Sequence, residues 1–233
     1  MTNAKAELYS YIQNIKKQCP TLNKMTDVEP FCNKNNINLI LHSFDDNGIC
    51  GFACIGEKKD TIVLNSRRNE IESFFDFIHE FIHTKRHRNV ASMWLLCSDK
   101  KQNSFLEWEA NEGAAEFIAP YKLFIPAFSD LYDLYMERFD IWKIIYGWVN
   151  VPQVLAGKFG ISEMMAIHRI ENLSYEIEQY RSKGTVEGIA LYSKKAQNKL
   201  NIVAKNYIDE LNLEEMKRRL SAIDSRAVSA MGF

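Results

Sequence analysis

The chain has 233 residues and a mass of 27.1 kDa, enough for one large domain or two small ones with a hydrophobic core. Hydrophobic residues make up 46% and charged residues 25%, and the mean hydropathy is -0.28, which excludes a disordered chain, a collagen and a coiled-coil rod. Lys and Arg total 29 against 30 for Asp and Glu, a net charge of -1, so we do not expect nucleic-acid binding through bulk charge.

The N-terminal residues 1–17 lack the apolar stretch of a signal peptide, and no apolar run approaches the roughly 20 residues of a membrane span. The chain has five cysteines, an odd number, and no Cys-x-x-Cys pair, which favours reduced thiols over disulfides or a cysteine metal site. We therefore expect a cytoplasmic protein with no membrane segment.

The first part of the chain is predicted to be α+β. Apolar residues at helical spacing predict a helix over residues 3–18, and three strand candidates follow at 37–44, 49–55 and 61–65. Asp45-Asp46-Asn47-Gly48 is a turn signal that predicts a hairpin between the first two strands. Helices are then predicted over residues 69–86 and 105–118.

The rest of the chain is predicted to be all helical. Residues 151–173 have the pattern of two helices separated by a turn at Gly160, as in a helix-turn-helix, and residues 194–221 are predicted to form one long charged helix. We place a domain boundary near residue 128, which gives domains over residues 1–128 and 129–233.

The clearest chemistry lies in the helix over 69–86, in the segment His79-Glu80-Phe81-Ile82-His83. Residues four apart lie one turn apart on the same helix face, so His79 and His83 can bind one Zn²⁺. Glu80 lies one step round the helix, where it is suited to take a proton from a water held by the metal. Apolar residues flank the motif, and buried histidines need partners. The pattern predicts a zinc metallopeptidase.

A catalytic zinc needs a third protein ligand and an open fourth position. The helix over 105–118 is the best source of this ligand, because its small residues permit a close approach to another helix. Glu107, Glu109 and Glu112 are the candidates. Asn111 follows Glu107 by four residues and is suited to orient that side of the site. Spacing alone does not choose among the three acids.

These motifs together resemble the ImmA/IrrE metallopeptidases, a family with a small zincin-like domain. The resemblance covers roughly residues 37–126. It rests on a strand over 62–65, the His-Glu-x-x-His helix, and a later stretch with Glu107-Trp108-Glu109-Ala110-Asn111 followed by alanines and Pro120.

The resemblance implies zinc as the cofactor, His79, His83 and Glu107 as its ligands, and Glu80 as the catalytic base. The fold that the resemblance implies is α+β, with a short antiparallel or mixed sheet and a metal-binding helix. Two departures from the family pattern concern packing: Phe81 and Ile82 stand where smaller residues are frequent, and Gly113 stands where an aromatic residue is usual.

The implied activity is hydrolysis of peptide bonds in a specific regulatory protein, often a helix-turn-helix transcriptional repressor. An oxyanion stabiliser beside the metal is also needed, and Arg86, His87 and Tyr121 are candidates. The strand over 61–65 is a candidate edge strand that pairs with an extended substrate.

Two alternative functions stay open. One is a non-catalytic zincin-like regulator that binds a partner protein, and the other is a DNA-binding protein that uses residues 151–173. The second helix of that segment offers only His168 and Arg169 for DNA contacts, which favours helical packing or partner docking. The basic run at residues 85–88 has two interpretations: charge that complements the helix dipole, or a rim for an acidic substrate. We favour the first.

Overall fold

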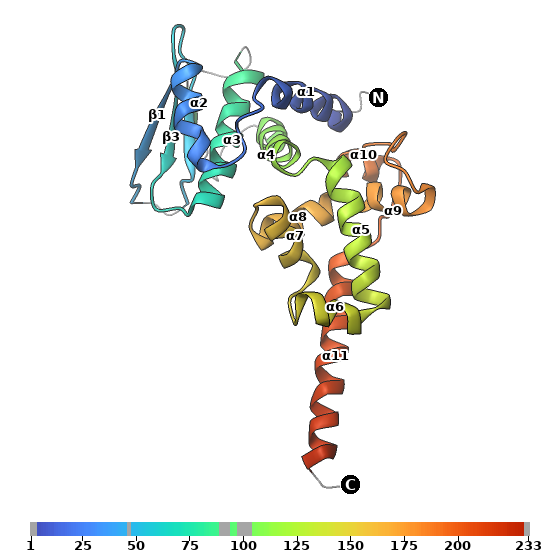
Figure 1. Ribbon diagram of the computed structural model, residues 1–233. Coiled ribbons are helices and arrows are strands. Elements are labelled where there is room, and N and C mark those ends of the chain that lie inside the picture. Colours follow the sequence, from blue (N-terminus) through green and yellow to red (C-terminus); the bar gives the residue numbers. More distant parts are fainter. Residues whose placement is uncertain (1–3, 46–47, 89–93, 97–103, 231–233) are drawn as a thin grey trace. The chain divides into compact units, whose positions relative to one another are not determined.

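A computed structural model of the protein describes residues 4–45, 48–88, 94–96 and 104–230 (Figure 1). Within these residues the chain has one mixed sheet and is otherwise mostly helical, which confirms the predicted α+β class with a helical C-terminal part. None of the described helices combines the length and the apolar composition that a bilayer crossing requires.

The chain divides into two compact units. The first consists of residues 1–121 and 156–162, and the second of residues 122–155 and 163–233. The boundary expected near residue 128 lies inside a helix, and the assignment of domains to residues 1–128 and 129–233 stays a prediction.

The first unit contains the three helices predicted from periodicity and one short helix that was not predicted. The helices are α1 (Ala4–Gln18), α2 (Val28–Lys34, preceded by the 3-10 turn η1, Met25–Asp27), α3 (Glu70–Arg86) and α4 (Ser104–Ile118). Helix α2 has only seven residues and contains Pro30, so its apolar spacing is too short to establish a period.

The sheet has the order β1-β3-β2-β4 within the described residues. Its strands are β1 (Ile37–His42), β2 (Gly51–Cys54), β3 (Asp60–Asn65) and β4 (Trp94–Leu96). Strand β3 pairs in parallel with β1 and antiparallel with β2, and β2 pairs antiparallel with β4.

Two sequence-based predictions about this sheet are wrong. The strands predicted to form a hairpin, β1 and β2, are not neighbours, because β3 lies between them. For the same reason the strand over 61–65 is not an edge strand. Its residues are buried almost continuously along β3, which is the burial of an interior strand.

The helices of the first unit stack outward from the sheet. Helix α3 packs on β2 and β3, α4 packs on α3, and α1 packs on α4. The contact between α3 and α4 is close at Gly113, where an added Cβ would lie 2.9 Å from Ile82 Cδ1 and 3.0 Å from Ile12 Cδ1. The small residues of α4 therefore bring this helix close to α3, as predicted.

All the described secondary structure after residue 120 is helical. The helices are α5 (Tyr121–Glu137), α6 (Phe139–Tyr146), α7 (Val151–Phe159), α8 (Glu163–Asn172), α9 (Ser174–Lys183), α10 (Lys194–Lys199) and α11 (Tyr207–Ala230). The single long helix predicted over 194–221 is wrong, because Asn201 has a left-handed backbone (φ 53°) and separates α10 from α11. Gly160, also left-handed (φ 64°), separates α7 from α8 as predicted.

Candidate metal centre

Helix α3 holds both histidines of the motif on one buried face. The Asn69 side chain caps the helix by accepting a hydrogen bond from the Glu72 backbone N–H at 2.9 Å. The helix then runs without a break through the motif, where every residue is buried. The imidazole centroids of His79 and His83 lie 4.8 Å apart, as one helical turn predicts.

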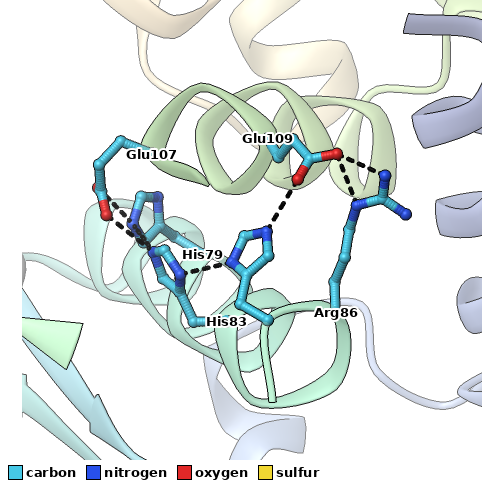
Figure 2. A network of polar contacts seen from close by, with 6 residues as sticks. His79, His83, Arg86, Glu107 and Glu109 are labelled. Atoms are coloured by element: carbon cyan, nitrogen blue, oxygen red, sulfur yellow. Dashed lines mark hydrogen bonds and ion pairs between the residues drawn. The ribbon is translucent and has the colours of Figure 1, made fainter. Parts of the chain in front are cut away.

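Helix α4 brings the carboxylate of Glu107 to these two imidazoles (Figure 2). The Nε2 atoms of His79 and His83 lie 3.1 Å apart. Glu107 Oε2 lies 3.3 Å from His79 Nε2, and Glu107 Oε1 lies 3.2 Å from His83 Nε2. Two nitrogens and a carboxylate from two helices therefore converge on one point.

The pKa values of Glu107 and His83 are shifted in the direction that a metal ligand needs. Burial opposes ionisation of Glu107, but hydrogen bonds with the two imidazoles outweigh it and lower its pKa to about 2. Burial, together with the neighbouring imidazoles, lowers the pKa of His83. Burial also disfavours a charge on His79, but its contacts with Glu107 and the charge of Glu80 raise its pKa. These pKa shifts favour an ionised Glu107 and a neutral His83, the forms that a metal would bind, whereas the shift of His79 favours its charged form.

The three groups lie close enough together to share one metal ion. Zinc bound to nitrogen or oxygen at about 2.0–2.1 Å has ligand atoms about 3.3–3.4 Å apart along each edge of the tetrahedron. In the cluster the two Nε2 atoms lie 3.1 Å apart, and each lies 3.2 or 3.3 Å from a different oxygen of Glu107. One ligand atom from each residue lies within 4.8 Å of the other two. Two imidazoles and one carboxylate are also a donor set that suits zinc better than Mg²⁺ or Ca²⁺, which prefer oxygen ligands.

Each histidine of the cluster makes a hydrogen bond through its other ring nitrogen. His79 Nδ1 lies 3.0 Å from Asn111 Oδ1, the residue predicted to orient this side of the site. His83 Nδ1 lies 2.8 Å from His87 Nδ1. Such contacts fix the ring orientation of metal-binding histidines and leave Nε2 facing the metal.

Glu109, the second candidate ligand, lies elsewhere. It accepts hydrogen bonds from Arg86, and its Oε2 lies 3.1 Å from His87 Nε2 (Figure 2). Burial works against its charge, but these partners lower the pKa of Glu109. Glu112, the third candidate, is buried and accepts a hydrogen bond from Tyr9. The structure thus brings Glu107 to the histidines and gives the other two acids different partners.

Glu80 is buried on the side of α3 that packs against the sheet. Its exposed fraction is 1%, and an added Cβ on Gly51 of β2 would lie 3.7 Å from Glu80 Cγ. The same Cβ would lie 2.7 Å from the Val63 carbonyl oxygen, so only glycine fits at this point of β2. The backbone of β2 therefore packs closely against the predicted catalytic base.

The three candidates for the oxyanion stabiliser all have structural partners. Arg86 binds Glu109, His87 lies between His83 and Glu109, and the ring of Tyr121 stacks on Tyr9 with centroids 5.5 Å apart. The basic run is also engaged within the fold, because Arg88 pairs with Asp60. A basic rim for an acidic substrate is therefore not supported by these residues.

A comparison with family models decides the family. The model Peptidase_M78, described as the IrrE N-terminal-like domain, matches residues 32–171, more than half of the chain. The chain belongs to this family. Membership confirms the resemblance to the ImmA/IrrE proteins and establishes a metallopeptidase-type function. The match includes both α3 and α4 of this IrrE-like domain. Among curated proteins, none matches the chain significantly.

The contacts of His87 with His83 and with Glu109 were not predicted from the sequence. A signal was available, because His79, His83 and His87 follow one another at intervals of four and so share one face of α3. The partner on α4 had no comparable local signal, since three acids lie close together on that helix.

Proposed function

We propose that this protein is a zinc-dependent endopeptidase whose metal is held by His79, His83 and Glu107 and whose general base is Glu80. The observation that carries the proposal is the convergence of the Glu107 carboxylate with two imidazole Nε2 atoms at 3.2 and 3.3 Å. Membership of a peptidase family supports the same chemistry. Three side chains of this kind leave the fourth position of a tetrahedral zinc open, as catalysis requires.

The mechanism assigns separate roles to the side chains. Zinc held by His79, His83 and Glu107 would lower the pKa of a coordinated water and polarise the carbonyl of the scissile peptide. Glu80 takes the proton of the attacking water and delivers it to the leaving amine. Burial of Glu80 against β2 keeps bulk water away from its carboxylate, so the proton passes between the base and the reacting groups.

The substrate that we propose is a specific regulatory protein, a helix-turn-helix transcriptional repressor. This part of the proposal comes from the ImmA/IrrE resemblance, whose members often cleave such repressors. A cytoplasmic location agrees with this substrate and stays a prediction.

The test is the Glu80→Gln variant, which keeps the shape of the side chain but cannot accept a proton. It should bind one zinc per chain, bind a helix-turn-helix protein encoded in the same genomic neighbourhood, and leave that protein uncut. Glu70→Gln, an exposed acid in the first turn of the same helix, is the matched control and should cut normally. Cleavage by Glu80→Gln at the wild-type rate would refute the assigned base.

The regulator alternative is separated by the same experiment. Zinc binding by the wild-type protein without cleavage of any of these candidates would favour a non-catalytic role. The DNA-binding alternative has little support, since Arg169 is buried with an exposed fraction of 2% and the exposed His168 contacts Glu171. Of the two side chains that the sequence suggested for DNA contacts, one is therefore buried and the other contacts an acid.

A further inference from the structure

We propose that His87 and Glu109 are positioning residues that support His83 in the form with its hydrogen on Nδ1 and Nε2 free to bind the metal. The inference rests on the proposed metal site and adds residues to it that do not touch the metal. It follows from a chain of contacts that runs from Arg86 through Glu109 and His87 to His83 (Figure 2).

The series of contacts begins at the carboxylate of Glu109, whose role as a hydrogen-bond acceptor is known. Arg86 Nε donates to Glu109 Oε1 at 2.8 Å, and a second guanidinium nitrogen donates to the same oxygen. A carboxylate paired with a guanidinium only accepts hydrogen bonds. Its other oxygen lies 3.1 Å from His87 Nε2, so that nitrogen carries a hydrogen and donates it.

The hydrogen on His87 Nε2 determines the role of the other ring nitrogen, Nδ1. A neutral imidazole has one N–H, so His87 Nδ1 presents a lone pair. This atom lies 2.8 Å from His83 Nδ1, and two lone pairs do not face each other at that distance. With a metal on His83 Nε2, the hydrogen of that ring is on Nδ1, which can donate it to His87 Nδ1. The Nε2 atom, on the side of Glu107 and His79, is then left to the metal.

The opposite polarity would block the site. With a hydrogen on His83 Nε2, an N–H would point at the other two ligand groups and occupy the place of a metal–nitrogen bond. Solvent cannot randomise the order, because the exposed fractions of His83, His87 and Glu109 are 0%, 1% and 4%. The contacts therefore give His83 an acceptor for its Nδ1 hydrogen when Nε2 binds the metal.

The experiment compares three substitutions with different effects on this order. His87→Phe fills the space but provides no acceptor, while His87→Asn leaves a void but places a side-chain oxygen near the position of Nδ1. Glu109→Gln has only one acceptor oxygen, for which Arg86 and His87 compete. When Arg86 takes it, the amide N–H₂ faces His87 Nε2 and reverses the order. The exposed residue His168 is the control, as His168→Asn.

Two measurements are made on the full chain. The first is the zinc dissociation constant by competition with a chromophoric chelator. The second is the ring tautomer of His87 in the zinc-loaded protein, from long-range ¹H–¹⁵N spectra, in which five histidines are few enough to assign. Metal-free circular dichroism shows that each variant is folded.

We expect His87→Phe and Glu109→Gln to weaken zinc binding about 10–100-fold, the usual effect of losing a partner behind a ligand histidine. His87→Asn should bind zinc more tightly than His87→Phe, whereas a packing role would give the reverse order. His87 should be the Nε2–H tautomer in the wild type and lose that state in Glu109→Gln. If His87→Phe does not fold, the near-isosteric Glu109→Gln and its tautomer decide the question.

The failure of this inference differs from the failure of the proposed function. Wild-type zinc affinity in His87→Phe and Glu109→Gln, with binding abolished by His79→Ala, would overturn the positioning role alone. A wild-type protein that binds zinc no better than His79→Ala would overturn both.

Discussion

Ile82 and Gly113, two of the three residues that depart from the expected family pattern, lie close together where α3 packs on α4. By the resemblance, smaller residues are frequent at position 82 and an aromatic residue is usual at position 113. An added Cβ at Gly113 would lie 2.9 Å from Ile82 Cδ1, below the separation of real Cβ contacts. The side chain of Ile82 therefore occupies the space beside Gly113.

The Gly113→Ala substitution tests this packing. The change that it causes in the free energy of unfolding can be worked out from two opposing effects. Alanine raises helix propensity by about 1 kcal/mol relative to glycine. Overpacking a tight core site costs about 1–3 kcal/mol, and both neighbours, Ile82 and Ile12, are fully buried and cannot swing into solvent. Gly157→Ala in α7 is the control, because an added Cβ there meets nothing within 4 Å. The propensity gain is common to both, so Gly113→Ala should be less stable than Gly157→Ala by about 1–3 kcal/mol.

The assay is urea unfolding followed by circular dichroism, with a double-mutant cycle on Ile82→Val. This change removes the Cδ1 atom nearest to the added Cβ and alone costs about 0.5–1.5 kcal/mol. In its background Gly113→Ala should be better tolerated, with a favourable coupling of at least about 0.5 kcal/mol. Equal stabilisation by the two alanine substitutions, or additivity in the cycle, would refute the argument.

Three further predictions concern the metal, a buried thiol and the helical unit. Chelation of zinc should lower the unfolding midpoint of the wild type but not of His79→Ala, since a ligand at 100 times its Kd stabilises by about 2.7 kcal/mol; equal responses would contradict the site. Burial, with the charge of Glu29, raises the pKa of Cys32 to about 11. The rate at which Cys32 is alkylated, measured by peptide mass mapping, should therefore rise tenfold per pH unit from pH 8 until about pH 11. A plateau of this rate near pH 9 would show an open thiol. Trp142 is fully buried and its Nε1 donates to the Val149 carbonyl at 2.9 Å, so Trp142→Phe should cost about 1–3 kcal/mol in urea unfolding, and an unchanged midpoint would contradict this contact.

What the sequence predicts well here is local geometry. A helix through residues 79–83 follows from apolar spacing, and the shared face of His79 and His83 follows from the helical repeat. The strand order does not follow in this way. The turn signal at residues 45–48 predicts a reversal of the chain but not which strand becomes the neighbour, and β3, later in the sequence, takes the place between β1 and β2.

The basic run after the motif shows the same limit. Lys85, Arg86, His87 and Arg88 end α3, where positive charge suits the helix dipole, and the sequence contains no sign of their specific partners. In the fold Arg86 pairs with Glu109 of α4, and Arg88 pairs with Asp60 of β3. A run of like charges on one segment is thus divided among acids from two other elements.

The choice between Glu107 and Glu109 depends on the packing of α3 against α4. Residues two positions apart on an α-helix, such as Glu107 and Glu109, point in directions about 200° apart and lie about 3 Å apart along the axis. The two acids therefore cannot both reach one metal. One reaches the pair of Nε2 atoms, and the other reaches His87 and Arg86 near the C-terminal end of α3. The approach of α4 at Gly113 therefore decides which acid faces the two Nε2 atoms and which faces His87 and Arg86. We expect a change in that packing to displace both carboxylates from their partners on α3, and so to weaken the proposed metal site together with the stability of the fold.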